Sequence, residues 1–150
     1  MPAAEDRAGS PGKLSLVMFS GAFDKVHYGL AMAAAAVASN RQATLFFTMG
    51  ALGALVAGAA AGPGWRRLLP TETGVDPLAA DAALTDGGMG GFEELLSASV
   101  ALGATVMVCE MGLRAMGIDA GQLRDDVPVT AGGLVTFLED AAADGAVVFI

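Results

Sequence analysis

Short apolar runs separated by turns and by longer helical segments set the pattern of this chain. Within each run the apolar positions are consecutive rather than alternating with polar ones, as in strands that are buried on both faces of a parallel sheet. We therefore predict β-strands at residues 13–19, 43–48, 104–108, 127–130 and 146–150.

Segments of helix-forming composition lie between these runs. Glutamates at the start of one segment, and Gly or Asn directly after three of them, are typical of helix ends. We predict helices at residues 24–39, 92–102, 110–116 and 131–143. Residues 68–91 instead mix Pro, Gly, Thr and Asp with little periodicity, which predicts a long excursion of the kind that is often functional or mobile.

The alternation of strands and helices predicts an α/β fold. Because parallel strands need crossover helices on the faces of the sheet, we expect a three-layer α/β/α architecture with a mainly parallel sheet of about five strands. The length suits a single domain at residues 13–150. Residues 1–12, which are polar and rich in Pro, Gly and charge, predict a disordered leader.

One stretch challenges a purely water-soluble interpretation. Residues 43–64 carry no charge, and their length is enough to span a bilayer. The same stretch is interrupted by several glycines and a proline, and its front end has the composition of a β-strand. We favour a buried strand followed by an Ala/Gly helix or loop, and a membrane-contacting segment is the alternative.

Composition narrows the classes of partner. The apolar share of 54% is ample for a core, and the formal net charge of -8 disfavours nucleic acid, whose phosphates need clustered Lys and Arg. A single cysteine excludes an intramolecular disulfide framework and a Cys-only metal site. A free thiol without a secretory signal suggests the reducing setting of the cytoplasm.

Neither a cofactor nor a metal is expected. Gly50 and Gly53 follow a predicted strand but do not form a GxGxxG fingerprint, and the glycine run at 87–91 is followed at once by two glutamates that would repel an anion. The chain has one His and one Cys, and its carboxylates near them are isolated, so the convergent ligands of a metal site are missing from the sequence.

The carboxyl ends of the first three predicted strands are where a site is expected, because ligands in such sheets gather there. The segments concerned are residues 20–25, which begin at Ser20, residues 48–53, and residues 109–111. Cys109 lies at the junction of a strand and a short helix, where helix N-terminal amides stabilise a thiolate. The alternative is an inert core thiol, since free Cys is among the most buried residue types.

Three residues of the first predicted helix are candidate neighbours of that thiol. The positive charge of Lys25 would favour the thiolate. Asp24 either caps the helix or holds Lys25, and capping is favoured. His27 would form a Cys–His dyad with Cys109 if the two met, but packing on the helix surface is the favoured interpretation.

Other residues are consistent with either interpretation of the thiol, activated or structural. Glu110 follows directly and opposes a thiolate by like-charge repulsion. Met49, Met107, Met111 and Met116 would line an apolar pocket around a sulfur atom, or would fill gaps in the core.

Several motifs together resemble the DsrE/DsrF-like sulfur-relay family, and within it the DsrE2-like branch that often carries a peroxiredoxin label. Residues 108–118 (VCEMGLRAMGI) resemble that family's Cys-x-Met-(small)-Met-x-x-Met-Gly segment, with Leu113 where a methionine is common. Residues 19–25 (FSGAFDK) resemble its strand-one motif with an Asp-Lys pair. Further likenesses lie at 45–52 and 132–150, whereas residues 54–90 depart from the pattern by being rich in Ala and Gly.

The resemblance implies a flavodoxin- or Rossmann-like fold, a small homo-oligomer (dimer or trimer), and no cofactor. It implies that Cys109 carries sulfane sulfur as a persulfide and exchanges it with a sulfur-carrier protein or a rhodanese-like donor. Asp24 and Lys25 would lie nearby, with Met111 and Met116 in the pocket wall. A peroxidase role is disfavoured because no second cysteine is present to resolve a sulfenic acid. The rival hypothesis is a non-catalytic, oligomeric binding or assembly protein of the same fold.

Overall fold

Parallel strands form the centre of the molecule, seen in a computed structural model that describes residues 12–150. The strands are β1 (Leu14–Met18), β2 (Ala43–Phe47), β3 (Thr105–Cys109), β4 (Thr130–Gly132) and β5 (Ala146–Phe149). They form one five-stranded sheet in the order β4-β3-β2-β1-β5, and every pair is parallel. The predicted α/β fold with a parallel sheet is confirmed. The predicted leader lies outside the described residues, apart from Gly12.

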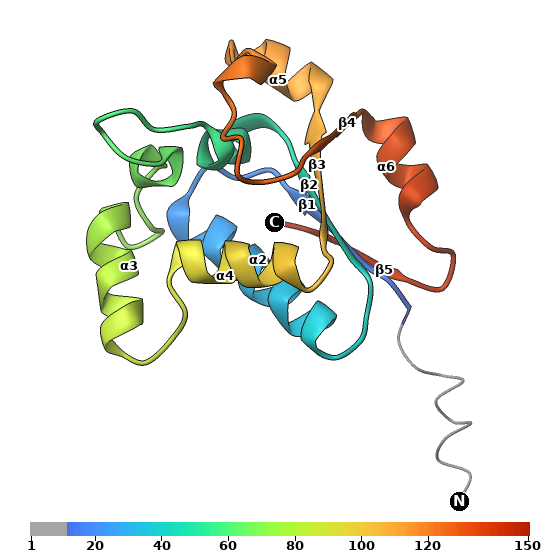
Figure 1. Cartoon of the computed structure of the whole chain (residues 1–150), viewed down its shortest axis with the longest axis horizontal. Coiled ribbons are helices and arrows are strands. Elements are labelled where there is room, and N and C mark those ends of the chain that lie inside the picture. The colour runs from blue at the N-terminus through green and yellow to red at the C-terminus, as the bar shows by residue number, and fades with distance from the viewer. Residues whose placement is uncertain (1–11) are drawn as a thin grey trace, which may run out of the picture.

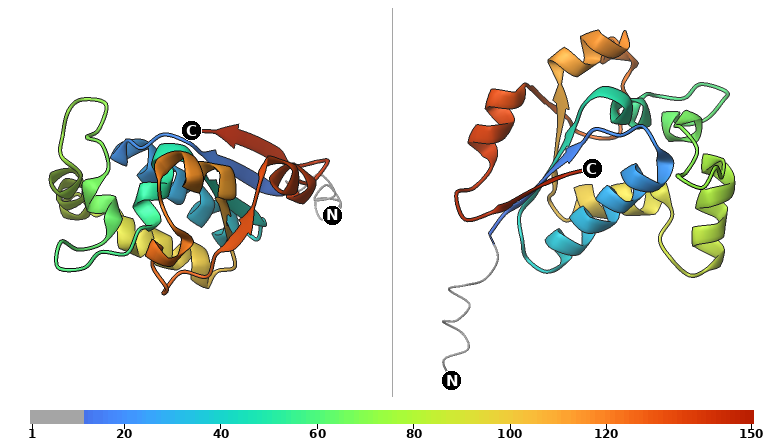
Figure 2. Two further views of the ribbon diagram at one scale, coloured as in Figure 1. Left: turned by 90° about the horizontal axis from the view of Figure 1, so that it is seen from above. Right: turned by 180° about the vertical axis from the view of Figure 1, so that it is seen from behind.

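Helices cover both faces of this sheet (Figure 1). The first face is covered by α2 (Phe23–Ala38) and α4 (Phe92–Ala101), and α6 (Leu134–Asp140) lies across the sheet from them (Figure 2). The short helix α5 (Glu110–Met116) continues directly from the carboxyl end of β3. Every residue of β1 and β2 is buried, because these strands lie in the middle of the sheet with neighbours on both sides.

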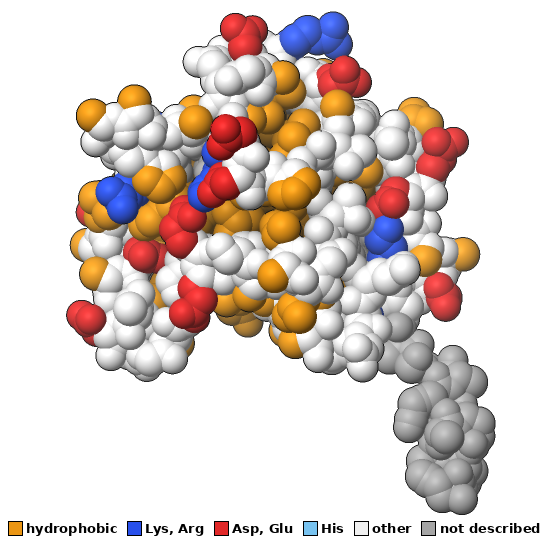
Figure 3. Space-filling view, viewed as in Figure 1, with side chains coloured by type: hydrophobic (Ala, Val, Ile, Leu, Met, Phe, Trp, Pro, Cys, Tyr) orange, Lys and Arg blue, Asp and Glu red, His pale blue; other side chains and the backbone are white. Residues whose placement is uncertain are grey.

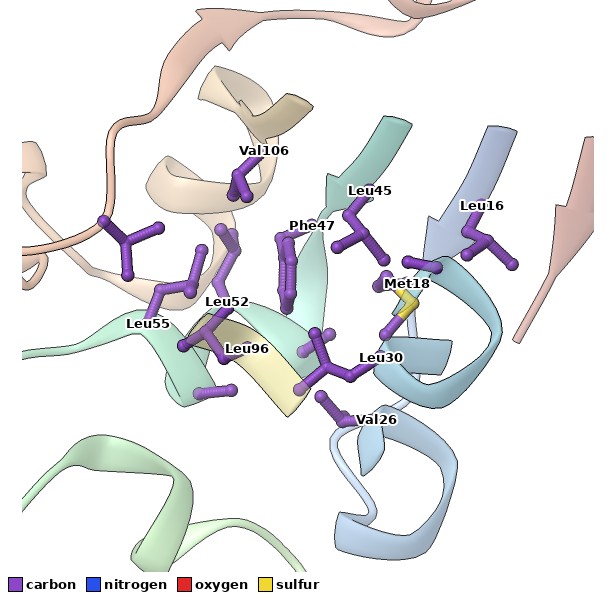
Figure 4. Close-up of a cluster of buried hydrophobic side chains, with 14 of the residues drawn as sticks. Leu16, Met18, Val26, Leu30, Leu45, Phe47, Leu52, Leu55, Leu96 and Val106 are labelled. Carbon is purple, nitrogen blue, oxygen red and sulfur yellow. The ribbon is translucent and has the colours of Figure 1, made fainter. Parts of the chain in front are cut away.

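The larger core lies between the sheet and the helices of the first face. Alternate strand residues such as Leu16, Leu45 and Phe47 point toward helix residues such as Leu30 and Leu96, as Figure 4 shows. The other strand residues point to the second face, where they form a smaller cluster. That cluster consists of Val17, Phe46, Met107, Cys109 and Phe137.

The uncharged stretch at residues 43–64 is a buried strand followed by tight turns, as favoured from the sequence. After β2 come the 3-10 helix η2 (Met49–Leu55), a loop, and a second 3-10 helix, η3 (Gly64–Arg67). A side chain is excluded at Gly64, because a Cβ there would lie 2.2 Å from the carbonyl oxygen of Gly53. Within residues 12–150, no helix has the length and apolar character needed to cross a bilayer.

The prediction for residues 68–91 was wrong in one respect. Helix α3 (Pro77–Asp86) lies in this segment, which showed little periodicity because α3 packs only one edge against the protein and exposes the rest. The sequence nevertheless carries a start signal for this helix, the pair Asp76-Pro77. In the structure Asp76 accepts a hydrogen bond from the amide of Ala79 at 3.1 Å, and Pro77 occupies the first turn.

The elements after α5 are shifted from their predicted positions. A 3-10 turn, η4 (Ala120–Gln122), precedes them. Strand β4 begins at Thr130 rather than at Val127, because Val127 is buried as a loop residue in the first-face core instead of pairing in the sheet. Helix α6 begins only at Leu134, after two consecutive glycines, and ends at Asp140.

Candidate functional site

The segments that follow β1, β2 and β3 meet at one edge of the sheet. The loops after β1 and β2 touch backbone to backbone, since a Cβ on Gly50 would lie 2.9 Å from the amide nitrogen of Gly21. The first turn of α5 packs equally closely on the segment after β2, since a Cβ on Gly112 would lie 2.7 Å from Oγ1 of Thr48. The expected convergence of these segments is therefore present, and glycines make it possible.

Cys109 ends β3 and is also the N-cap residue of α5. Its Sγ accepts a hydrogen bond from the amide of Gly112 at 3.3 Å. This bond gives the sulfur a polar partner at the start of α5. The tight packing of Gly112 against Thr48 holds that amide in place.

The rest of the surroundings of the sulfur is apolar and supports the structural interpretation of the thiol. The Cys109 side chain is only 1% exposed and belongs to the second-face cluster with Val17, Phe46, Met107 and Phe137. Burial among apolar side chains is typical of a structural cysteine. Within residues 12–150, the amide of Gly112 is the one hydrogen-bond donor found at Sγ. The two interpretations of the thiol, activated and structural, thus each have one physical feature in the same site.

Ser20 and Asp24 accept hydrogen bonds from backbone amides around the start of α2. Ser20 accepts a hydrogen bond from the amide of Ala22 at 3.1 Å, and Asp24 accepts one from the amide of Glu72 at 3.0 Å through its second carboxylate oxygen. The N-cap of α2 is Ala22, without a side-chain hydrogen bond, so the favoured capping role of Asp24 was wrong. The carboxylate instead ties the loop around Glu72 to the helix.

Lys25 is exposed and lies in the first turn of α2, which follows β1. The strand register sets Met18 beside Phe47 and Phe47 beside Val108, so β1 and β3 are two strands apart. Adjacent strands are about 4.8 Å apart, which puts the chain after β1 roughly 10 Å from Cys109. Lys25 lines a separate hollow of about 750 Å³ together with Phe19, Tyr28 and Phe149, among others.

His27 does not form a dyad with the cysteine. It belongs to α2, on the first face of the sheet, whereas the Cys109 side chain lies on the second face. The ring is 8% exposed, its Nε2 donates to the carbonyl oxygen of Gly90 at 2.8 Å, and it packs beside Phe23 at a ring separation of 5.7 Å. The favoured packing role of His27 is therefore what the structure has.

The methionines near the cysteine in sequence are distributed differently from a pocket wall. Met111 and Met116 lie on α5 and are 49% and 47% exposed, and Glu110 is exposed as well. Met49 is half-buried, and its φ of 47° is unusual for a residue other than glycine. Of the four candidate methionines, Met107 is the one that lies in the same cluster as the sulfur.

Sequence reasoning missed the pair of aromatic side chains that shares a cluster with the cysteine. Phe46 and Phe137 stack with ring centroids 4.8 Å apart in the same cluster as Cys109. Phe137 comes from α6, and its apolar position within the predicted helix at 131–143 was the only available signal. Which strand it covers depends on the path of the chain across the second face.

A cluster of charged side chains around Arg124 was not expected from the sequence. Arg124 donates to both carboxylate oxygens of Glu93 at 2.8 Å and to both of Asp126 at 2.7 Å, and the Trp65 indole also donates to Glu93 at 2.8 Å. The hydrogen bonds from Arg124 lower the pKa of Glu93 and of Asp126, and in return the carboxylates raise the pKa of the guanidinium. The cluster joins η3, α4 and the loop before β4.

No set of three or more His, Cys, Asp or Glu side chains that could hold a metal ion occurs within residues 12–150.

No protein-family model and no curated protein matches the sequence. Among solved structures, the chain is similar to the ychN protein from E. coli, with a TM-score of 0.57 and 18% identity over 93% of this chain and 99% of that one. It also matches MTH1491, a protein of unknown function from Methanobacterium thermoautotrophicum, with a TM-score of 0.47 and 13% identity over 93% and 99% of the two chains. The first likeness shows that this chain has a DsrE/YchN-like fold.

Proposed function

We propose that this chain is a sulfur-relay protein that carries sulfane sulfur as a persulfide on Cys109. The observation that carries the proposal is the hydrogen bond from the Gly112 amide to Sγ, at the carboxyl end of a central strand. A DsrE/YchN-like fold is compatible with this role. The sequence around Cys109, which resembles the cysteine segment of sulfur-relay proteins, adds the choice of chemistry.

The exchange requires only the thiolate and a sulfur donor. The Cys109 thiolate attacks the outer sulfur of a donor persulfide, the donor's S–S bond breaks, and the donor leaves as a thiolate while Cys109 becomes a persulfide. A second thiolate, on an acceptor, then removes that sulfur in the same way. A sulfur-carrier protein or a rhodanese-like protein, in the cytoplasm, is the partner that this reaction needs.

Access to the sulfur requires the second face to open. Cys109 is buried in the same cluster as Phe137 of α6, and α6 has only seven residues, preceded by Gly132 and Gly133. Its C-terminal end is fastened to the sheet by Asp140, which pairs with Lys13 and accepts a hydrogen bond from Thr44 at 2.7 Å. We propose that α6 moves away from the sheet transiently in the native protein and exposes Sγ, and that the sulfur partner binds this open form.

Mass spectrometry of the intact protein after incubation with polysulfide or thiosulfate tests the proposal. We expect one added sulfur on Cys109 in the folded wild-type protein and none in Cys109→Ser. The sulfur should be removed by a small thiol and by an added acceptor protein. A folded protein that gains no sulfur, while the urea-unfolded protein does, would contradict a relay role.

A second candidate is a binding or assembly protein of the same fold in which Cys109 is structural. The 1% exposure of Cys109 favours it. Alkylation with iodoacetamide distinguishes the two candidates, because a relay cysteine should react in the native protein at a measurable rate. A thiol that reacts only when the protein unfolds supports the structural role.

Both candidates include assembly into a homo-oligomer. Phe19 and Phe149 pack against each other at 5.3 Å and are 44% and 67% exposed, beside the edge strand β5. We propose that a second copy covers this apolar edge, since each copy would then bury its own patch. Light scattering of Phe149→Asp should show a smaller particle than the wild type. An unchanged mass, or binding of the wild type to lipid vesicles instead, would contradict it.

A further inference from the structure

A hollow on the first face of the molecule is separate from the cysteine. It has a volume of about 460 Å³ and lies between α2, the turn at residues 71–75 and α3. Binding sites for small molecules have volumes of about 300–1,000 Å³ and mainly apolar linings with few polar groups. The apolar part of the lining comes from Phe23, Val75, Ala80, Ala83, Leu84 and Met89.

His27 is among the residues that line this hollow. Its Nε2 lies 2.8 Å from the carbonyl oxygen of Gly90. A carbonyl can only accept, so Nε2 carries a hydrogen, and in the tautomer with its single hydrogen there Nδ1 offers a lone pair. Among residues 12–150 no hydrogen-bond donor to Nδ1 is found. A ligand with a hydroxyl group would supply that donor.

Charge excludes anions from this hollow. Asp24 is in its lining, and the carboxylate accepts hydrogen bonds from the amides of Lys25 and Glu72 rather than pairing with a cation. The protein has 16 acidic and 8 basic side chains. Acidic side chains also predominate on the face seen in Figure 3. A neutral ligand is therefore favoured over a carboxylate or a phosphate.

The walls of the hollow are held in place without a ligand. Asp76 caps the start of α3. Asp81, on the same helix, accepts a hydrogen bond from the amide of Phe92 at 2.7 Å and so joins α3 to the start of α4. Because the site is preformed, binding needs little ordering of the protein.

We propose that this hollow binds a small, neutral aromatic molecule whose hydroxyl group donates a hydrogen bond to Nδ1 of His27. The ring lies against Val75 and the alanines of α3, with Tyr28 at the mouth. Nothing in this proposal depends on Cys109, so the site is a second functional feature of the chain.

Isothermal titration with 2-naphthol as the probe tests this proposal on the full chain. We expect saturable binding at a 1:1 ratio, weakened roughly tenfold for 2-methoxynaphthalene, which lacks the donor. Naphthalene-2-sulfonate should bind more weakly still. Equal affinity for 2-naphthol and its methyl ether, or no binding of 2-naphthol, would overturn the proposal.

A pair of variants places the probe in the hollow. Ala83→Phe fills the space from an exposed position of α3 and should weaken 2-naphthol binding at least tenfold. Ala82→Phe adds the same ring to the neighbouring exposed residue, which does not line the hollow, and should bind like the wild type. Equal loss in both variants would place the probe elsewhere. Cys109→Ser should bind 2-naphthol unchanged, whether or not sulfur transfer is found.

Discussion

The amide of Gly112 donates a hydrogen bond to the sulfur of Cys109, three residues earlier in the chain. This bond links the carboxyl end of β3 to the first turn of α5, and it supplies the polar contact at an otherwise apolar site. Its geometry depends on a glycine, because α5 packs directly on the chain after β2. The first three predictions concern this arrangement.

Gly112→Ala should destabilise the protein, although alanine is normally the better helix former. The new Cβ would lie 2.7 Å from Oγ1 of Thr48 and 2.9 Å from the backbone nitrogen of Met49, which cannot rotate away. Overpacking of this kind costs about 1–3 kcal/mol. Urea unfolding measures the loss. Gly121→Ala is the control, since a Cβ there meets nothing within 4 Å; equal effects of the two substitutions would refute the packing argument.

Cys109→Ser and Cys109→Ala should differ in stability. Serine keeps an acceptor for the Gly112 amide at the N-cap of α5, whereas alanine leaves that amide without a partner. Loss of an N-cap acceptor costs about 0.5–2 kcal/mol, so the serine variant should be the more stable by roughly 1 kcal/mol. Thermal unfolding of both variants provides the measurement. If alanine proves the more stable, the hydrogen bond contributes less than the cost of burying a hydroxyl.

Phe137→Leu should make Cys109 more reactive in the folded protein. Phe137 is 1% exposed and stacks on Phe46 in the cluster that contains Cys109, so a smaller side chain loosens the packing of that cluster. We expect native-state alkylation at least severalfold faster, at a cost of about 1 kcal/mol in stability. Leu138→Ala is the control, because Leu138 is 61% exposed on the same helix. Unchanged alkylation in Phe137→Leu would place the access route elsewhere.

Asp140→Asn should destabilise the protein at neutral pH but not in acid. Burial raises the pKa of Asp140, but the hydrogen bonds from Lys13 and Thr44 outweigh it, so the pKa in the folded protein is lowered. A lowered pKa means that the carboxylate stabilises the fold above its unfolded pKa, near 3.8, and that this contribution is lost as the pH falls through the folded value.

The measurement is urea unfolding of wild type and Asp140→Asn at pH 7 and at pH 3. We expect the wild type to be more stable by roughly 1 kcal/mol at pH 7, with the gap narrowing at pH 3. A gap that is the same at both values would show that the charge of Asp140 is not what stabilises α6.

Arg124→Lys should not replace the arginine. The guanidinium donates two hydrogen bonds to Glu93 and two to Asp126, and an ammonium group cannot reproduce that planar arrangement. We expect a loss of about 1–3 kcal/mol, together with a change in Trp65 fluorescence, since its indole donates to Glu93. Arg114→Lys, at an exposed position of α5, should leave both unchanged. Wild-type behaviour of Arg124→Lys would mean that charge alone suffices.

Strong local patterns predicted most elements closely. The apolar runs of β1, β2 and β3 and the Gly117 stop of α5 located those elements to within one or two residues. Weak patterns misled at α3, whose single packed edge gives little periodicity, and at β4, where buried Val127 looks like a strand residue but lies in a loop. The Asp76-Pro77 pair was the overlooked signal for α3.

The sequence by itself determined the fold class and the position of Cys109 at a sheet edge, because consecutive apolar runs and glycine stops are local signals. Only the tertiary structure decided what surrounds the sulfur. Strand alternation decides which face the Cys109 side chain points to, and the path of α6 places Phe137 in the same cluster while His27 lies across the sheet. These depend on contacts between residues far apart in the chain, which no local pattern records.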